Sequence, residues 1–161
     1  MAFDDFDLDN VPSNAHRLYR LIHDLYVVLD VGDREVLQPL GLTPSQYRVL
    51  VLLDANFGQR LITLSDRLLV ARSTITRLID QMETAGWVHR IDDPSDRRAQ
   101  HVALTPVGLA LRNQAYAAHE HSLEDRMGVL GEHDQQHLID FFLQMRTALR
   151  NRIIEIDSQR E

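Results

Sequence analysis

The chain contains 161 residues, of which 44% are hydrophobic and 25% are charged, a balance typical of a folded globular protein. Its apolar runs are shorter than the ~18–20 residues that cross a membrane, and its acidic start lacks the basic and apolar segments of a secretory signal. No cysteine is present, which excludes disulfides, thiolate metal ligands and thiol nucleophiles. We therefore expect a cytoplasmic protein without a membrane partner.

The net charge of −7 is distributed unevenly along the chain. All 17 basic residues are arginine. Residues 60–101 carry seven arginines against six acidic residues, net +1, whereas the regions before and after them are net negative. Because local placement of charge matters more than the total for contact with nucleic acid, the acidic balance of the whole chain does not exclude such a partner.

Capping signals and helical spacing of apolar residues predict six helices. Ser13, the Thr43-Pro44-Ser45-Gln46 capping box and Thr105-Pro106 are typical helix starts. The first helix is expected to end at Gly32 or at Pro39-Leu40-Gly41, and Gly86 supplies a left-handed stop for the fourth. The expected helices begin at Ser13, Thr43, Thr63, Arg72, Thr105 and Gly131, and the second to fifth end near Asn56, Leu69, Thr84 and Met127.

Two β-prone runs, Trp87–Ile91 and Ala99–Leu104, flank a turn-rich segment and predict a hairpin. The predicted order is therefore α-α-α-α-β-β-α-α. Two helices joined by a tight turn, followed by a hairpin with arginines at its tip, indicate a winged helix-turn-helix. The expected fold class is mainly α with a small β-hairpin wing.

The fourth predicted helix has one apolar and one polar face. Its apolar stripe at i, i+3, i+4 and i+7 is Ile75, Leu78, Ile79 and Met82. Arginine can donate two hydrogen bonds to a guanine edge, hydroxyls reach bases or phosphates, and a helix N-terminus favours a phosphate. The candidate DNA-reading residues in the major groove are Arg72, Ser73, Thr74, Thr76 and Arg77.

The tip of the predicted hairpin contains Asp96, Arg97 and Arg98. Arginine suits a narrow minor groove, where negative potential is concentrated. Asp96 can pair with an arginine and hold the tip in shape. We therefore expect this tip to bind DNA beside the fourth helix.

Several motifs occur in the order found in one family. They are Leu64-Ser65-Asp66-Arg67-Leu68, Arg72 to Asp80, Gly86-Trp87-Val88, Asp93 to Arg98, and Leu104-Thr105-Pro106-Val107-Gly108. Together they closely resemble the multiple-antibiotic-resistance regulator (MarR) family. The specific block covers residues 61–108, and the flanking helices agree in number and place, so the resemblance extends over nearly the whole chain.

The resemblance implies a ligand-responsive transcriptional regulator, most often a repressor, without a cofactor. It implies a homodimer on a palindromic double-stranded operator, released by a small aromatic or phenolic effector. Residues 12–40 and 106–157 would form a helical dimerisation lobe, residues 41–105 the DNA-binding lobe, and residues 1–11 a disordered acidic terminus. By position, the candidate residues named above would read the groove and form the wing.

Two positions depart from the family pattern. Ala71 stands where the family often has an acidic helix cap, so that cap is missing. Asp92-Asp93 adds negative charge to the wing near the phosphates, which predicts weaker non-specific binding.

Aromatic and imidazole side chains recur along the first predicted helix and form a band beside its apolar stripe. An amphipathic edge of a dimer interface explains the band, and so does one wall of an effector pocket whose rings stack on an aromatic ligand. The candidate effector residues are His16, Tyr19, His23, Tyr26, Tyr47 and Arg48.

His133 and His137 have the i, i+4 spacing of a metal-binding pair, with Asp140 one turn further on. Two solvated imidazoles are the simpler interpretation, and no metal ligand is assigned. A metal-responsive regulator, a helical interaction protein and a metal hydrolase remain alternatives. No phosphate loop, glycine fingerprint or Ser/His/Asp arrangement occurs, so an enzyme is not expected.

Overall fold

The computed structural model describes residues 12–54, 58–92 and 100–158. One compact unit ends at Glu120 and a second begins at His121. None of the described helices combines the length and apolar character needed to cross a membrane. The elements in chain order are α1 (Asn14–Leu37), the 3₁₀ turn η1 (Gln38–Leu40), α2 (Pro44–Leu52), β1 (Gln59–Arg60), α3 (Leu61–Leu68), α4 (Arg72–Thr84), β2 (Val88–Asp92), β3 (Gln100–Leu104), α5 (Pro106–Met127) and α6 (Glu132–Ser158).

The predicted helix caps at Ser13, Thr43 and Thr105 are confirmed. The Ser13 hydroxyl oxygen accepts the His16 N–H at 3.4 Å. Thr43 Oγ1 accepts the Gln46 N–H at 3.2 Å while Gln46 Oε1 accepts the Thr43 N–H at 2.9 Å, which completes the capping box. Thr105 Oγ1 accepts the Gly108 N–H at 3.0 Å at the start of α5.

Of the two predicted ends of α1, the later one at Pro39-Leu40-Gly41 is confirmed: the helix continues through Gly32 to the fully buried Leu37, directly before that segment. Packing there outweighs the ~1 kcal/mol cost of an interior glycine. Other helix limits differ from the predicted ones. α2 already ends at Leu52. α3 begins at Leu61 rather than at Thr63, and Arg60 caps it without a side-chain hydrogen bond. Burial of the leucines of α3 against the core therefore decides this start, and the threonine does not.

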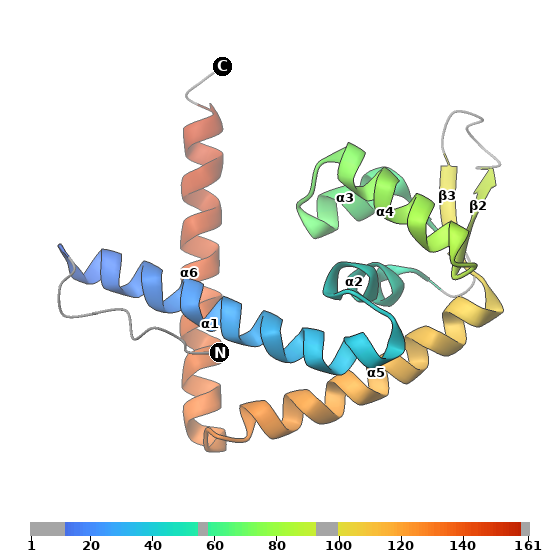
Figure 1. Cartoon of the computed structure of the whole chain (residues 1–161). Coiled ribbons are helices and arrows are strands. Elements are labelled where there is room, and N and C mark those ends of the chain that lie inside the picture. The colour runs from blue at the N-terminus through green and yellow to red at the C-terminus, as the bar shows by residue number, and fades with distance from the viewer. Residues whose placement is uncertain (1–11, 55–57, 93–99, 159–161) are drawn as a thin grey trace. The chain divides into compact units, whose positions relative to one another are not determined.

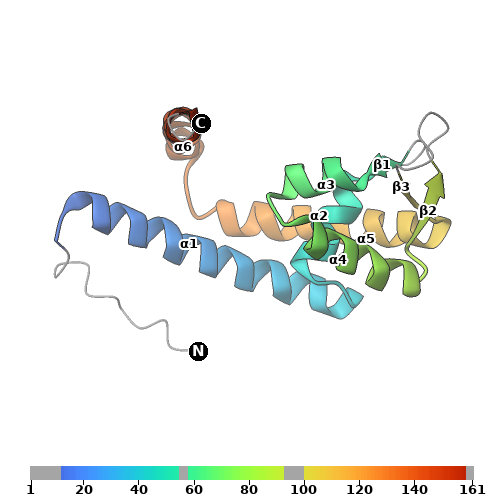
Figure 2. The same cartoon turned by 90° about the horizontal axis from the view of Figure 1, so that it is seen from above.

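The first unit has one hydrophobic core, around which α2, α3, α4, the sheet and the first part of α5 gather (Figure 2). The predicted stripe of α4 supplies three of its buried side chains: Ile75, Ile79 and Met82 are at most 1% exposed. Leu78 packs against the same core and is partly buried. The remaining fully buried large side chains are Leu37, Val49, Leu50, Leu53, Leu64, Val88 and Val102.

The sheet has three antiparallel strands in the order β1-β3-β2. The predicted hairpin is formed by β2 and β3, which stand side by side next to α4 (Figure 1). The strand β1 was not predicted, because two residues are too few to show an alternating pattern. It pairs Arg60 with His101, so the segment that leads into α3 is hydrogen-bonded to the hairpin.

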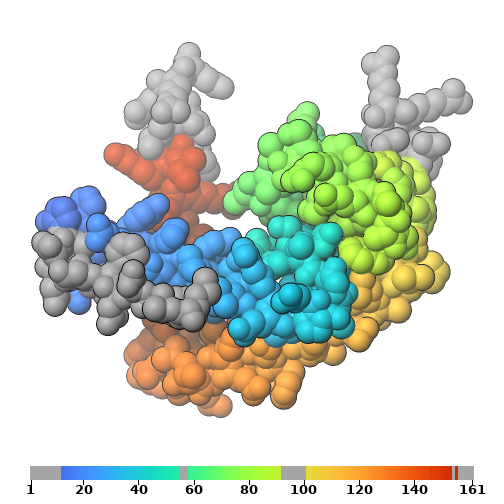
Figure 3. Space-filling model, viewed as in Figure 1, coloured from blue at the N-terminus to red at the C-terminus, as the bar shows by residue number. Residues whose placement is uncertain are grey.

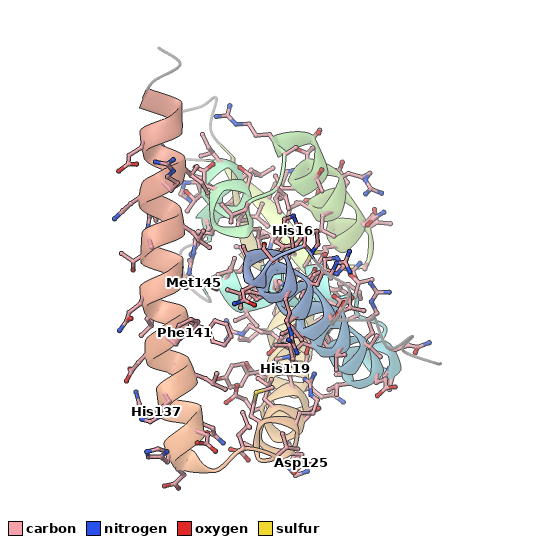
Figure 4. The ribbon with its side chains drawn as sticks, turned by 90° about the vertical axis from the view of Figure 1, so that its left-hand side faces the viewer. His16, His119, Asp125, His137, Phe141 and Met145 are labelled. Carbon is pink, nitrogen blue, oxygen red and sulfur yellow. The ribbon has the colours of Figure 1, made fainter. Side chains whose placement is uncertain are left out.

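The second unit contains the end of α5 and the whole of α6. Gln135 Nε2 donates to the carbonyls of Met127 and Leu130, at 3.1 and 3.0 Å, and so caps the end of α5. Large apolar side chains of α6 are exposed, and Phe141 and Met145 lie one turn apart on it (Figure 4).

Candidate nucleic-acid interface

The predicted reading residues lie on the outward face of α4, which also includes the exposed Asp80. Burial of the apolar stripe turns the opposite side of the helix to solvent, so Arg72, Ser73, Thr74, Thr76 and Arg77 are all exposed. This part of α4 lies open on the face of the molecule shown in Figure 3. The structure thus brings these five polar side chains together on one helix, as predicted.

The start of α4 has no side-chain cap. Ala71 occupies the cap position and makes no side-chain hydrogen bond there, as its sequence position predicted. The Thr76 hydroxyl donates to the Arg72 carbonyl at 2.9 Å, so its proton is used within the helix and its oxygen remains available as an acceptor. The face therefore offers a helix N-terminus and two guanidinium groups as donors, with hydroxyl oxygens between them.

A tight turn joins α4 to the hairpin. Gly86 has φ +76°, a conformation that suits glycine. The Trp87 N–H donates to the Met82 carbonyl at 3.0 Å, and Thr105 Oγ1 donates to the Gly86 carbonyl at 2.6 Å. These bonds hold the first residue of the hairpin against the last turn of the helix.

Arg90 of β2 binds two carboxylates of α4, and this contact was not predicted. Its Nη2 lies 2.5 Å from Asp80 Oδ1, and its Nη1 pairs with Glu83 Oε2. Glu83 Oε1 also accepts the backbone N–H of Arg90 at 3.0 Å. Side chains alternate along β2, so Arg90 lies on the same face as the buried Val88. A charged side chain on a buried face needs a partner of opposite charge. This pattern is the sequence signal that could have predicted an ion pair of Arg90.

The predicted tip residues Asp96, Arg97 and Arg98 lie outside the described residues. The described strands on either side end at Asp92 and begin again at Gln100. The positions of these three side chains therefore stay a prediction.

The structure does not bring the six effector candidates together around one cavity. His16, Tyr19, His23 and Tyr26 are exposed along α1, whereas Tyr47 is buried in α2 and 7% exposed. The ring of Tyr47 contacts that of His119 on α5, with centroids 4.8 Å apart. Arg48 points to Asp30 of α1, at 4.0 Å.

Tyr47, His119 and Asp33 connect three helices of the first unit. His119 Nε2 lies 3.1 Å from Asp33 Oδ1, and both side chains are largely buried; Figure 4 marks His119 on α5. Burial raises the pKa of Tyr47 to about 12, and the negative charge of Glu120 adds to the effect. The phenol is therefore neutral at physiological pH. The i, i+2 spacing of His119 and His121 turns the two rings apart on a helix, so no sequence signal indicated this cluster.

A surface groove of about 460 Å³ lies where α1 meets the start of α2. Its lining includes Asp30, Arg34, Gln38 and the segment Thr43-Pro44-Ser45. Arg34 pairs with Asp30 at 2.7 Å, so this wall of the groove has no net charge from that pair.

His133 and His137 lie close together at the start of α6, with ring centroids 4.1 Å apart. Asp140 accepts a hydrogen bond from Gln136 at 3.0 Å. Within the described ranges, no group of three or more His, Cys, Asp or Glu side chains is arranged to hold a metal ion.

Comparison with known proteins agrees with this arrangement. A profile described as the MarR family matches residues 42–99. The HTH-type transcriptional regulator MhqR of Bacillus subtilis is 31% identical over 117 residues, which are 68% of this chain and 81% of MhqR.

Solved structures of family members superpose over most of the chain. AbsC, a MarR family transcriptional regulator from Streptomyces coelicolor, gives a TM-score of 0.78 at 25% identity, covering 88% of this chain and 99% of AbsC. A mutant MarR from Escherichia coli complexed with operator DNA gives 0.72 at 28% identity, covering 80% and 91%. CouR from Rhodococcus jostii, bound to p-coumaroyl-CoA, gives 0.72 at 25% identity, covering 84% and 95%.

The chain carries a helix-turn-helix, a hairpin and an exposed polar face on α4. The share of MhqR that the chain covers, and the operator-bound relative of the same fold, place it in the same family as these relatives. The chain belongs to the MarR family and is a DNA-binding transcriptional regulator, not an enzyme.

Proposed function

We propose that the protein is a repressor that recognises a palindromic operator as a homodimer and is released by a small aromatic or phenolic ligand. The observation that carries the proposal is the polar face of α4, which is solvent-exposed directly opposite the buried stripe of the same helix. A face of this composition fits the major groove, and the operator-bound relative supports the assignment.

The reading residues of this proposal are Arg72, Ser73, Thr74, Thr76 and Arg77, and the wing residues are Asp96, Arg97 and Arg98. The first five share the exposed face of α4, where arginine can bind a guanine edge with two hydrogen bonds. The wing residues follow β2 in the chain, and minor-groove contact is proposed for them from their composition.

A single winged helix makes few base contacts, so tight specific binding calls for two copies on adjacent half-sites. Exposed apolar side chains on α1 and α6 support pairing through these helices; they include Leu18, Leu25, Phe141, Leu149 and Ile153. The proposed dimerisation lobe is residues 12–40 and 106–157, and the proposed DNA-binding lobe is residues 41–105.

Effector release rests on the exposed rings of α1 and on the bound p-coumaroyl-CoA of CouR. Tyr47 is buried against the His119 ring, so the proposal assigns ring stacking to the exposed side chains of α1. The test is to add p-coumaroyl-CoA and a set of simple phenolic acids to the protein–DNA complex. Dissociation by one of them, weakened in a His23→Ala variant, is the expected result.

The DNA-reading proposal is tested by Arg77→Ala. The wild-type protein first selects its preferred duplex from a random-sequence pool, and the affinity of both proteins for it is measured. Loss of a two-bond guanine contact should cost about 1–3 kcal/mol and relax the preference at one base pair. Arg67→Ala removes an exposed arginine from α3 as the matched control. An Arg77→Ala protein with an unchanged sequence preference would remove Arg77 from the reading face.

A further inference from the structure

Arg90 connects the two elements proposed to bind DNA, the hairpin and α4. It comes from the hairpin, and both carboxylates that it binds come from α4. Asp80 lies one turn beyond Arg77 and Thr76 on the helix. The ion pairs therefore connect the strand that leads into the wing with the helix that carries the reading residues.

The contact is more than a surface ion pair, because three hydrogen bonds converge on it. The Arg90 side chain is 21% exposed, and its guanidinium bridges Asp80 and Glu83. The backbone N–H of Arg90 binds the same Glu83 carboxylate at 3.0 Å. The hydrogen bond with Asp80 and the nearby charge of Glu83 raise the pKa of Arg90 above its usual value, so Arg90 keeps its positive charge at physiological pH.

Val88 and Val102 of the hairpin pack into the same core as the apolar stripe of α4, and polar contacts attach the hairpin to α4 at two further points. One is the Gly86 turn, where the Trp87 N–H binds the Met82 carbonyl. The other is Arg90, three residues further along the strand. A turn alone acts as a hinge, and a second attachment at a distance from it fixes the angle.

We propose that Arg90 is a positioning residue for DNA binding, which fixes the angle between the hairpin and α4 so that wing and helix enter their grooves together. The proposal rests on the proposed reading of DNA by α4 and the wing. The donors of Arg90 bind carboxylates of the same chain, which distinguishes it from the outward-facing Arg77.

The experiment compares Arg90→Met, Arg90→Lys and Arg77→Met on the duplex that the wild-type protein selects from a random pool. Affinity is measured over a range of salt concentrations. We expect Arg90→Met to weaken binding roughly tenfold with the salt dependence of the wild type, because no phosphate contact is lost. If Arg77 also contacts a phosphate, Arg77→Met should lower the slope of log affinity against log salt concentration by up to about one unit. If Arg77 contacts only a base, Arg77→Met should relax the base preference. Arg90→Lys, which keeps the charge but not the two-carboxylate geometry, should fall between wild type and Arg90→Met.

Footprinting of the same complexes separates the two grooves. With Arg90→Met, protection of the minor groove by the wing should be lost while guanine protection in the major groove remains. Glu83→Gln keeps an oxygen that can accept the Arg90 backbone N–H, but it removes the charge and replaces the oxygen that Arg90 Nη1 binds by an NH2 group. It therefore tests the same idea if Arg90→Met does not fold. It should show the same footprint change with a smaller loss of affinity.

Three results would overturn the proposal: wild-type affinity and footprint for Arg90→Met, a salt slope reduced by about one unit for Arg90→Met, or an Arg90→Lys protein equal to wild type. The proposed function fails separately. It fails if the wild-type protein selects no duplex, or if Arg77→Met changes neither affinity nor preference.

Discussion

Leu69, in the turn between α3 and α4, has a left-handed backbone with φ 54° and a side chain that is 91% exposed. A non-glycine residue there costs about 1–2 kcal/mol, and an exposed leucine gains little by burial. Leu69→Gly should therefore raise the free energy of unfolding by about 1 kcal/mol, measured by denaturant titration. Leu69→Ala keeps the Cβ and the strain, so it should give no such gain; an equal gain in both variants would contradict the strain argument.

Tyr47 gives the fold a dependence on alkaline pH. Its pKa is raised from 10.0 to about 12 by burial, so the unfolded chain loses this proton at lower pH than the folded protein does. The stability tied to the neutral phenol is complete below pH 10 and is lost as pH rises toward 12. We expect the free energy of unfolding of the wild-type protein to fall over this pH interval. The free energy of unfolding of the Tyr47→Phe variant should fall less steeply over the same interval. Parallel curves for both proteins would show that Tyr47 is not responsible.

At the scale of single elements, the start of α5 packs closely against the backbone that links α4 to the hairpin, and Gly108 makes this contact with Trp87. A Cβ built there would lie 1.8 Å from the Trp87 carbonyl oxygen, so the backbone would have to move. Gly108→Ala should lower the free energy of unfolding by about 1–3 kcal/mol in thermal or denaturant melts. Gly131→Ala is the control, since its Cβ meets nothing within 4 Å. Equal stability of the two variants would contradict this packing.

Elements whose local signals agree with their packing could be predicted from the sequence. Thr43 and Thr105 cap helices as expected, and α4 has its predicted limits, because its stripe also builds the core. The start of α3 and the strand β1 could not be predicted, since core burial and pairing with β3 determine them. The five polar residues of α4 followed from periodicity, whereas the partners of Arg90 are known only once β2 is folded onto the helix.

At the scale of the whole molecule, the proposed homodimer makes a direct prediction. Ile153 is 60% exposed on α6. In a dimer that covers it, Ile153→Asp buries an uncompensated charge and should separate or unfold the dimer, measured by sedimentation at micromolar concentration. Asn151→Asp adds the same charge at an exposed polar position of α6 as the control. A wild-type protein that sediments as a monomer, or an Ile153→Asp protein that binds the full palindrome normally, would end the dimeric proposal.

The edges of the three-stranded sheet affect how readily copies of the protein aggregate. An open sheet edge exposes backbone donors and acceptors to which a foreign strand can add, and this is a common start of aggregation. Here one outer strand, β1, has only two residues. On the other outer strand, β2, the Glu83 carboxylate already takes the Arg90 N–H. Such a sheet is a poor template for strand addition, which agrees with the proposed pairing of the chains through helices.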